Sequence, residues 1–331
     1  MNVSRKFPQS RLRRTRFTSS IRSLVAENSL SVDDLIQPIF VKEDLDGLEN
    51  IDSLPGISRY GLNALDEEIE KIQNNKIKAV AIFPVINPDK KDETGSDSLN
   101  EDNLVCTAIK QIKKNSELAV IADVALDPYT SHGHDGVLDE NGYVENDKSL
   151  SLLVEQALTL AKAGADMVAP SDMMDGRISG IRNSLESNNF TNTIILSYAA
   201  KYSSKFYGPF RDAVGSSANL GVGSKDTYQM SVANIDEALH EVKMDIEEGA
   251  DIVMVKPGMP YLDVIKAVKD TFKVPTFAYQ VSGEYAMLKA AIENDWLSDE
   301  VMLESLLSFK RAGADCVLTY AANEIAIKLN Q

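Results

Sequence analysis

Two lysines stand near the ends of apolar runs, where buried strands would present them to one site. Lys256 directly follows the run 252–255, and Lys201 comes four residues after the run 193–197. Burial or a second cation destabilises a charged ammonium, which lowers its pKa and leaves a neutral amine that can attack a carbonyl. We interpret the pair as candidate Schiff-base nucleophiles. The alternatives are a lysine that extends to solvent and one that binds phosphate.

Other polar side chains also follow apolar runs. If the runs are parallel strands, their carboxyl ends meet on one face of the sheet, and the polar groups converge there. A protein without a site would place some polar residues at strand ends, but not two lysines. The additional polar residues at these ends are Asp123, Ser171, Asp172, Ser197, Ser282 and Tyr320.

The elements that would position these residues alternate along the chain. Eight short runs rich in Val and Ile are separated by segments of helical periodicity, such as 62–72, 152–161 and 301–309. This alternation predicts an α/β protein with a closed (β/α)8 barrel, the TIM barrel. An open doubly wound sheet is the alternative, but no G-x-G-x-x-G turn follows the first strand. The predicted strands are 35–41, 79–84, 119–124, 167–169, 193–197, 252–256, 276–281 and 316–320.

A short phrase recurs between a helix and the next strand. Residues 163–166 and 312–315 read Ala-Gly-Ala-Asp, and 248–251 read Glu-Gly-Ala-Asp. Glycine suits the left-handed residue that ends a helix. The phrase therefore predicts structural turns at the bottom of the barrel and no catalytic role.

The composition is that of a globular protein with a negative surface. Of 331 residues, 44% are hydrophobic and 25% charged, and the formal net charge is −16. Such a surface repels a phosphate backbone, so we expect no nucleic-acid partner. No apolar run reaches the ~18 residues of a membrane span, so we expect no membrane partner. The two cysteines, Cys106 and Cys316, have no metal-ligand spacing, which fits buried thiols in a reducing cytoplasm.

The N-terminal region differs in charge from the rest. Seven lysines and arginines precede the first acidic residue, Glu27. We interpret residues 1–30 as an arm that holds an acidic neighbouring subunit, and residues 31–331 as one catalytic barrel. An organelle transit peptide is the alternative for such an arginine-rich, serine-rich start.

Several motifs in order are specific enough to suggest a family. From about Arg11 to its end the chain resembles the porphobilinogen synthase (5-aminolevulinate dehydratase) family. A set of motifs in order is more specific than any single short pattern. The stretches that carry the resemblance are Tyr-Thr-Ser-His-Gly-His at 129–134, Ser-Tyr-Ala-Ala-Lys at 197–201, Phe-Tyr-Gly-Pro-Phe-Arg at 206–211, Met-Val-Lys-Pro at 254–257 and Tyr-Gln-Val-Ser-Gly-Glu-Tyr at 279–285.

The resemblance implies a reaction and roles for both lysines. Family members are (β/α)8 barrels that condense two 5-aminolevulinate molecules into porphobilinogen with loss of two waters, an early step of tetrapyrrole (heme) synthesis. Lys201 would hold the substrate of the P site and Lys256 that of the A site, each as an imine. Asp123 would transfer protons, and Ser171 is a further catalytic candidate.

The substrate carboxylates also need partners. By the same resemblance, Ser282 and Tyr320 would hold the P-site carboxylate, and Arg211, Lys225 and Gln229 the A-site carboxylate. Lys225 stands where we expect arginine. Lysine cannot form the bidentate contact, so the site would bind the A-site carboxylate less tightly. The long stretch 206–231 that contains these residues predicts a lid over the mouth.

The metal expectation follows from an absence of cysteine. Zinc-type relatives carry cysteines where Ala125, Asp127 and Asp135 stand here, so we expect no catalytic zinc. Asp127 and Asp135 suit Mg²⁺, a water network or a solvated acidic loop. Glu241 falls on the glutamate position of a second magnesium site that part of the family has near a subunit contact, with Asp172 nearby.

The resemblance also implies a homo-oligomer, most often an octamer formed through the arms.

Two other functions compete with this interpretation. A Schiff-base aldolase needs only one lysine, so loss of activity on replacing either Lys201 or Lys256 would favour the condensation. A non-catalytic acidic scaffold or metal-binding protein forms no imine with substrate, and borohydride trapping would separate it from both enzymes.

Overall fold

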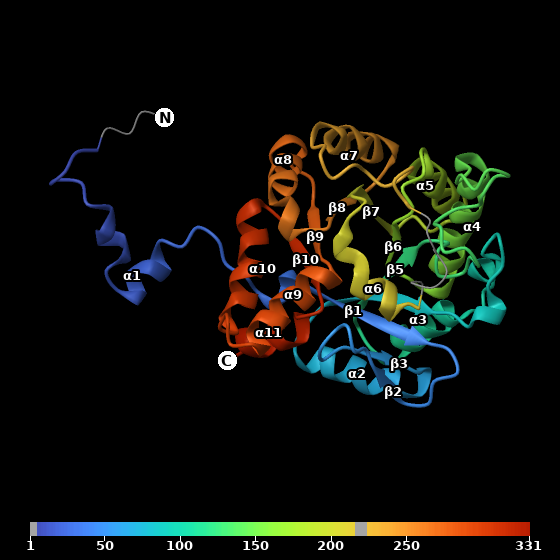
Figure 1. The fold of residues 1–331 in the computed structure, drawn as a ribbon, viewed down its shortest axis with the longest axis horizontal. Coiled ribbons are helices and arrows are strands. Elements are labelled where there is room, and N and C mark those ends of the chain that lie inside the picture. The colour runs from blue at the N-terminus through green and yellow to red at the C-terminus, as the bar shows by residue number, and fades with distance from the viewer. Residues whose placement is uncertain (1–4, 216–223) are drawn as a thin grey trace.

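The computed structural model describes residues 5–215 and 224–331 and contains a closed barrel of eight parallel strands (Figure 1). Neighbouring strands follow the chain order, and pairing of the first strand with the last closes the ring. All eight predicted strands are present, so the predicted TIM barrel is confirmed. The barrel strands are β1 (Leu35–Lys42), β4 (Ala79–Val85), β5 (Ala119–Val124), β6 (Met167–Pro170), β7 (Ile194–Lys201), β8 (Ile252–Lys256), β9 (Thr276–Gln280) and β10 (Cys316–Thr319).

Helices surround the barrel, as the periodic segments predicted. Their apolar faces pack on the strands, and this explains why the strands are buried on both faces and read as continuous apolar runs. No helix in the described part of the chain is long and apolar enough to cross a membrane. The helices are α1 (Ser19–Leu24), α2 (Leu62–Asn74), α3 (Leu104–Asn115), α4 (Asn146–Ala163), α5 (Arg177–Ser187), α6 (Gly208–Ala213), α7 (Asp236–Glu248), α8 (Leu262–Phe272), α9 (Ser282–Glu293), α10 (Glu300–Ala312) and α11 (Ala322–Leu329), with short 3-10 turns at Leu12–Arg16, Val32–Asp34, Pro88–Lys90, Ser96–Leu99, Lys205–Tyr207 and Met259–Tyr261.

The repeated glycine phrase ends three helices at the bottom of the barrel, which we call the floor. Gly164, Gly249 and Gly313 cap α4, α7 and α10 with φ of +107°, +110° and +112°. A side chain is strained in this left-handed conformation, so glycine is favoured there. The prediction of structural turns is confirmed.

A small hairpin was not predicted. β2 (Leu48–Asn50) and β3 (Ser58–Tyr60) are antiparallel, and β3 pairs with the end of β1. These strands are three residues long and partly exposed, so they carry no apolar run that a sequence pattern could detect. From the hairpin, Arg59 donates to the carbonyls of Asp212 and Ala213 at the end of α6.

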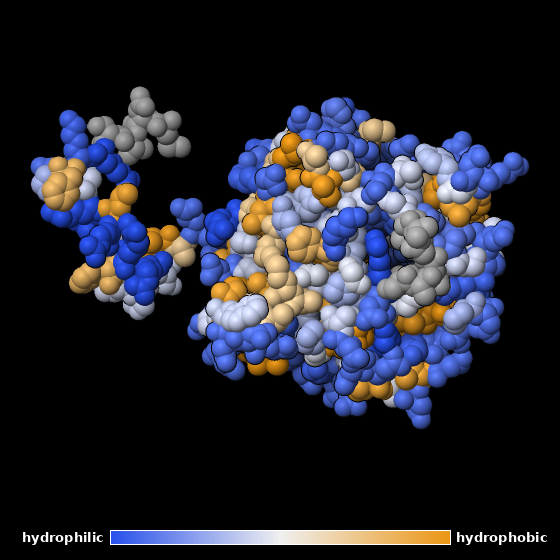
Figure 2. All heavy atoms as spheres, in the orientation of Figure 1, coloured by the Kyte–Doolittle hydropathy of each residue, from blue (hydrophilic) through white to orange (hydrophobic). Residues whose placement is uncertain are grey.

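Residues 5–29 form an extended arm that leaves the barrel (Figure 1). Neither its 3-10 turn nor α1 contains a buried residue. Phe17 and Leu24 are both 84% exposed, and apolar and basic side chains are mixed along the arm (Figure 2). The boundary at residue 30 and the role of the arm both stay predictions.

The two cysteines are unpaired, as expected. Cys106 lies fully buried in α3, whereas Cys316 opens β10 at the floor and keeps partial exposure. Burial raises the pKa of both thiols to about 11. The prediction of buried thiols is therefore confirmed for Cys106 and only in part for Cys316.

Candidate active site

Lys201 and Lys256 are paired neighbours on adjacent strands. They are the last residues of β7 and β8 and stand directly opposite one another in the parallel ladder. The register of this pair shifts between Ser197 and Ala200, which places one extra residue in β7. Without the bulge, Ala200 would stand opposite Lys256. A bulge re-aims side chains in this way, and here it brings both lysines to the same level of the mouth, the carboxyl end of the barrel.

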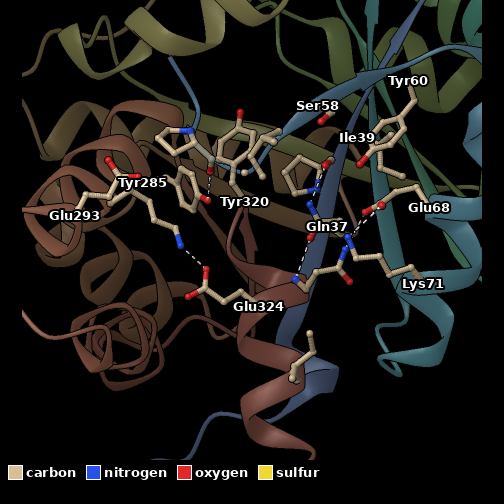
Figure 3. A pocket seen from close by; sticks show the side chains of 17 residues that line it. Gln37, Ile39, Ser58, Tyr60, Glu68, Lys71, Tyr285, Glu293, Tyr320 and Glu324 are labelled. Carbon is tan, nitrogen blue, oxygen red and sulfur yellow. Dashed lines mark hydrogen bonds and ion pairs between the residues drawn. The ribbon is translucent and has the colours of Figure 1, made fainter. Parts of the chain in front are cut away.

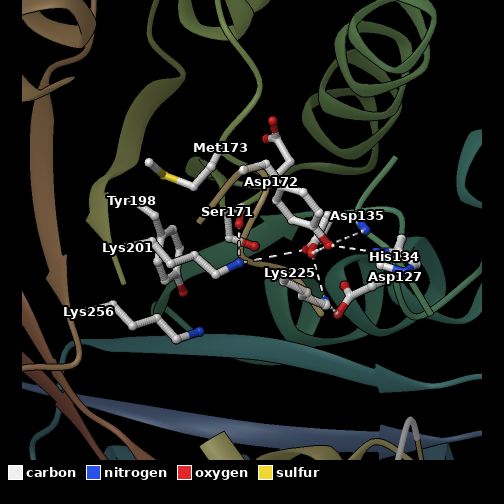
Figure 4. A network of polar contacts seen from close by, with 12 residues as sticks. Asp127, His134, Asp135, Ser171, Asp172, Met173, Tyr198, Lys201, Lys225 and Lys256 are labelled. Atoms are coloured by element: carbon white, nitrogen blue, oxygen red, sulfur yellow. Dashed lines mark hydrogen bonds and ion pairs between the residues drawn. The ribbon is translucent and has the colours of Figure 1, made fainter. Parts of the chain in front are cut away.

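Lys201 makes polar contacts on the side of the site away from Lys256 (Figure 4). Its side chain is only 7% exposed. The ammonium donates a hydrogen bond to the Ser171 carbonyl, and it lies 3.7 Å from Asp135 Oδ1. Ser171, which follows β6, therefore contacts the lysine through its backbone. The predicted catalytic role of Ser171 stays a prediction.

Lys256 lies in an aromatic environment. Its Nζ lies 4.8 to 5.4 Å from the ring centroids of Tyr279, Tyr198, Phe210 and Tyr207. Within residues 5–215 and 224–331 its ammonium has no hydrogen bond or ion pair. Burial, followed by the charge of Lys201, lowers the pKa of Lys256 to about 7. The amine is thus neutral in a large fraction of molecules at neutral pH, as nucleophilic attack on a ketone requires.

Asp123 is the acidic group that faces both lysines. Burial raises its pKa to about 7, although the charges of Lys256 and Lys201 and the Ser171 hydroxyl oppose the shift. Its Oδ1 is buried without a hydrogen-bond partner among the described residues. A carboxyl group that titrates near neutral pH can both give and take a proton. The position agrees with its predicted role in proton transfer.

Asp127 and Asp135 hold a cation that belongs to the chain itself. The Lys225 ammonium lies 2.9 Å from Asp127 Oδ2 and 2.6 Å from Asp135 Oδ2 (Figure 4). Tyr228 also donates to Asp135 Oδ2, at 3.0 Å. Burial disfavours the charge of Lys225, but the two carboxylates outweigh it and raise the pKa of the lysine. Burial likewise opposes the charge of Asp135, but Lys201 and Lys225 lower its pKa to about 2.

This arrangement does not fit a metal at the two aspartates. The Lys225 ammonium already pairs with both carboxylates, and within the described ranges no three His, Cys, Asp or Glu side chains are arranged to bind a metal ion. The solvated acidic loop that we considered is also wrong, because Asp135 is buried. The sequence missed the ion pairs because Lys225 lies 90 residues from Asp135 along the chain.

The three residues predicted to bind the A-site carboxylate meet at the lysines. Arg211, Lys225 and Gln229 line the same cavity as Lys201 and Lys256. The cavity has a volume of only about 40 Å³. That is room for roughly three waters, so side chains at the mouth must move before two substrates can enter.

The predicted P-site residues lie outside the lysine cavity, next to aromatic residues that surround Lys256. The Ser282 hydroxyl accepts from Phe210 N–H at 2.9 Å, and the Tyr320 hydroxyl lies 2.9 Å from that of Tyr279. Neither residue lines the lysine cavity. Tyr320 instead borders a second cavity of about 410 Å³ between β1, α9 and α11 (Figure 3). That cavity is larger but contains neither lysine, so we assign the chemistry to the smaller one.

Glu241 lies away from the lysines, on α7. It lines a polar cavity of about 320 Å³ together with Asp175, Asp226 and Glu237. Burial raises the pKa of Glu241, while the charge of Arg177 opposes the shift. Several carboxylates around one cavity are the donor type that a hard cation such as Mg²⁺ prefers.

The aromatic residues around Lys256 are the part of the site that sequence reasoning missed. Tyr198 and Tyr279 lie within β7 and β9, and Tyr207 and Phe210 come from the segment that follows β7. All were present in the quoted motifs, but there they appeared only as marks of resemblance. Aromatic residues in the inner barrel strands beside a terminal lysine were the available signal, because such rings exclude water from the amine.

The fold and these side chains define a (β/α)8-barrel enzyme with two buried lysines at its mouth. Residues 9–328 match the family described as delta-aminolevulinic acid dehydratase. The chain belongs to this family. It is 54% identical over 321 residues to delta-aminolevulinic acid dehydratase of Bradyrhizobium diazoefficiens, which covers 96% of this chain and 90% of the relative. It is 53% identical to that of Methanothermus sociabilis, with 97% and 98% covered.

A solved structure agrees with this assignment. The delta-aminolevulinic acid dehydratase (porphobilinogen synthase) of Toxoplasma gondii, in complex with the reaction product porphobilinogen, superposes with a TM-score of 0.95. It is 48% identical, and the match covers 97% of this chain and 91% of that one. The chain is accordingly a lyase that condenses two 5-aminolevulinate molecules into porphobilinogen, in tetrapyrrole synthesis.

Proposed function

We propose that the two lysines carry this condensation, each as the imine of one 5-aminolevulinate molecule. The observation that carries the proposal is their direct pairing on β7 and β8, because parallel partners lie about 4.8 Å apart and would hold two substrates side by side. The pKa of about 7 at Lys256 supplies the neutral amine. A single-lysine aldolase would have no need of the second buried lysine.

The proposed reaction forms two imines and then joins the two substrates. Each Nζ attacks a ketone carbon, and the resulting carbinolamine loses water to give a protonated imine, which withdraws electrons from its neighbours. The C–C bond forms when a carbon next to one imine loses a proton and attacks the imine carbon of the other substrate, and the C–N bond forms when an amino group attacks the remaining imine carbon. Each bond between a lysine and substrate carbon then breaks, with its electron pair leaving on Nζ, and a ring carbon loses a proton. Both lysines return to amines when the product leaves, so the overall reaction releases two waters.

Asp123 would move the protons of these steps. It faces both lysines and titrates near neutral pH, so it can protonate a leaving hydroxyl and accept a proton again later. The Ser171 carbonyl would orient Lys201, since it accepts the hydrogen bond of that ammonium. The aromatic rings around Lys256 would stabilise its positively charged imine by cation–π attraction.

The A-site carboxylate would replace Asp127 and Asp135 as the hydrogen-bond acceptor of Lys225. This lysine is charged and held by Asp127 and Asp135, next to Arg211 and Gln229 in the lysine cavity. A substrate carboxylate that enters this small cavity can accept from Lys225 in place of the aspartates. Ser282 and Tyr320 would hold the P-site carboxylate, which requires that they exchange their present hydroxyl and backbone partners.

We assign the metal to Glu241 and not to the lysine site. Because no three His, Cys, Asp or Glu side chains are clustered among the described residues, Mg²⁺ in the cavity around Glu241 would be held by few carboxylates and mostly by water. The absence of cysteine near the lysines is against catalytic zinc. Bound there, Mg²⁺ would neutralise the neighbouring carboxylates. Chelation with EDTA followed by titration with Mg²⁺ or Zn²⁺ tests this assignment. We expect Mg²⁺ alone to change the activity, and no effect of Glu241→Gln on that response would contradict it.

We also propose that the arm binds a second copy of the chain in a homo-oligomer, as an octamer in the cytoplasm. The arm is basic while the whole chain carries −16, and its Phe17 and Leu24 are exposed. Replacing both apolar residues by serine should lower the oligomer mass seen by light scattering. An unchanged mass would contradict the role of the arm.

Borohydride trapping tests the function directly. The protein is incubated with 5-aminolevulinate, reduced with borohydride, and digested for mass spectrometry, while porphobilinogen is assayed in a parallel sample. We expect a reduced adduct on Lys201 and another on Lys256. An adduct on one lysine only, with no porphobilinogen formed, would overturn the proposal in favour of an aldolase.

A further inference from the structure

The hydroxyl of Ser197 contacts a helix outside the barrel, although we expected the polar residues at the strand ends to converge on the mouth. Ser197 is fully buried, and its hydroxyl donates to Asp245 Oδ2 of α7 at 2.5 Å. Arg177, the first residue of α5, lies against both groups: its Nη2 is 3.3 Å from the Ser197 hydroxyl and 3.3 Å from Asp245 Oδ2. Three polar side chains from three elements thus form a buried cluster that has no part in the proposed chemistry.

This cluster lies at the bulge that brings the two lysines to the same level. Ser197 is the last residue of β7 in register with β8 before the bulge, and the pairing resumes at Ala200. Arg177 also donates to the carbonyl of Tyr198, inside the bulge, at 3.5 Å. A bulge interrupts the regular backbone ladder and re-aims the side chains that follow it. The cluster therefore contacts the start and the interior of the bulge, just before the strand reaches Lys201.

The same arginine also contacts the segment that orients the Lys201 ammonium. Its Nε lies 3.6 Å from Asp172 Oδ2, and its Nη1 donates to the Met174 carbonyl at 3.2 Å. Asp172 directly follows Ser171, whose carbonyl accepts the hydrogen bond of Lys201 (Figure 4). One guanidinium therefore joins the strand that carries Lys201 to the loop that holds the end of its side chain.

Stability alone does not account for these buried charges. Arg177 is 2% exposed, Asp172 0% and Asp245 3%. The loss of hydration offsets much of the attraction between buried charges, so a buried ion pair adds little net stability. Its directional hydrogen bonds do fix the geometry of the groups that they join. Here those groups are the bulge of β7 and the loop after β6.

We propose that Asp245 and Arg177 are positioning residues that hold the bulge of β7 and so keep Lys201 level with Lys256. This inference rests on the proposed function, in which both lysines form imines. Without the cluster, β7 could relax toward the regular register, in which Ala200 stands opposite Lys256. A slip of one residue turns side chains to the other face of a sheet, so even partial relaxation moves the Lys201 amine away from the substrate.

Lys256 provides an internal reference for this proposal. It is presented by β8, and within residues 5–215 and 224–331 no hydrogen bond or ion pair joins it to the side chains of Ser197, Arg177 or Asp245. A change in the cluster should therefore act on one lysine and leave the other in place. A general loss of stability would affect both.

The test compares Asp245→Asn with Asp251→Asn. Asp251 is a matched control because it also joins β7 to α5, but at the floor: it accepts the Ile195 N–H at 2.8 Å and pairs with Arg182. Borohydride trapping at saturating 5-aminolevulinate is timed separately for the peptides of the two lysines. The value of kcat and the thermal midpoint are measured on the same preparations.

The expected result differs between the two lysines. For Asp245→Asn we expect the Lys201 adduct to form at least about tenfold more slowly, and kcat to fall by a similar factor, because the amine is no longer aligned. The Lys256 adduct should form within about threefold of the wild-type rate, since its strand is not held by the cluster. Asp251→Asn should lower the thermal midpoint and leave kcat and both adducts unchanged.

Three other results would overturn the inference. If both adducts slow equally while the thermal midpoint falls, Asp245 only stabilises the fold. If kcat and the Lys201 adduct keep their wild-type rates, it positions nothing. An equal slowing of the Lys201 adduct in Asp251→Asn would show that any weakening of β7 has this effect. Should the wild type itself form no Lys201 adduct, the proposed function fails instead, and the two failures are thus distinguishable.

A second variant covers the case in which Asp245→Asn does not fold. Loss of a carboxylate beside a buried guanidinium can be strongly destabilising. Ser197→Ala removes only the hydroxyl and leaves the ion pair between Arg177 and Asp245 in place. We expect a smaller slowing of the Lys201 adduct, about threefold to tenfold, with the Lys256 adduct preserved. A wild-type rate of the Lys201 adduct in this variant would contradict the inference.

Discussion

The floor and the mouth of the barrel use the same residue types in opposite environments. At the floor, Asp166, Asp251 and Asp315 follow the three glycine turns, and their carboxylates accept the backbone N–H of Val120, Ile195 and Thr276 in the preceding strands. Each also pairs with a cation on the helix before that preceding strand: Lys113 of α3, Arg182 of α5 and Lys269 of α8, respectively. All three carboxylates remain partly exposed, and every charge has a partner.

The mouth concentrates its charges in a buried volume instead. Lys201, Lys225 and Lys256 meet Asp123 and Asp135 there, and the pKa values of Asp123 and Lys256 move to about 7. Lys256 has rings around it where the floor lysines have a carboxylate. The comparison teaches that burial and missing partners, rather than residue type, separate a reactive lysine from a structural one.

The largest expected effect is that of Lys256→Met. Product formation should fall by a factor on the order of 10³ or more, because the nucleophile is lost. Because the pKa of Lys256 falls from 10.5 to about 7 on folding, burial of its charged form destabilises the fold. This destabilisation is complete below pH 7 and absent above pH 10.5. The variant should therefore gain free energy of unfolding near pH 6, on the order of a few kcal/mol.

Porphobilinogen assays and urea unfolding measure both quantities. Lys113→Met at the floor is the matched control. It should keep full activity, and its free energy of unfolding should fall by up to about 1 kcal/mol. A Lys256 variant that stayed active, or a floor variant that lost activity, would remove the distinction between the two regions.

The next effect concerns Lys225. Lys225→Gln removes a charged donor to the substrate carboxylate, which is worth about 1.5–3 kcal/mol, so KM should rise roughly 10- to 100-fold with a smaller change in kcat. Asp127→Asn leaves Lys225 with one partner fewer in the resting site, so its KM should fall. Steady-state kinetics at fixed pH distinguish the two variants. Equal rises of KM in both would show that Lys225 serves only to hold the aspartates.

The pH dependence of kcat/KM should follow the deprotonation of Lys256 to its neutral amine. Because its pKa lies near 7, kcat/KM should rise about tenfold per pH unit up to pH 7 and then level off. The charge of Asp123 raises the pKa of Lys256, so Asp123→Asn should move the rising limb to lower pH, along with a lower overall rate. A profile that is flat between pH 5.5 and 7.5 would contradict the assignment of Lys256 as the titrating group.

The smallest effect is expected at the floor. Asp315→Asn keeps an acceptor for Thr276 N–H and loses the ion pair with Lys269, which is partly exposed. The free energy of unfolding should fall by about 1 kcal/mol or less, with kcat and KM unchanged. Urea unfolding and kinetics on the same preparation check this. A change in kcat would mean that the floor influences the mouth.

Much of the fold was predictable because its signals are local. The eight strands appeared as apolar runs, and the ends at Ala119–Val124 and Ile252–Lys256 agreed with the prediction. The prediction of 193–197 stopped short, since β7 continues to Lys201 through Tyr-Ala-Ala. Those residues are not strongly apolar as a group, and only pairing with β8 keeps them extended.

The sequence by itself determined the barrel, the lysines at its strand ends and the glycine turns of the floor. These depend on the apolar pattern, on the position of a residue within an element and on the conformational freedom of glycine, all of which act over a few residues. The family motifs then identified the reaction.

Only the tertiary structure decided the environment of each charge. The strand pairing that sets Lys201 opposite Lys256 and the ion pairs of Lys225 with Asp127 and Asp135 join segments remote in the chain. Electrostatic energies depend on distance and burial, which a linear pattern does not contain. Two lysines were therefore visible in the sequence, but the lowered pKa of Lys256 followed from its packing.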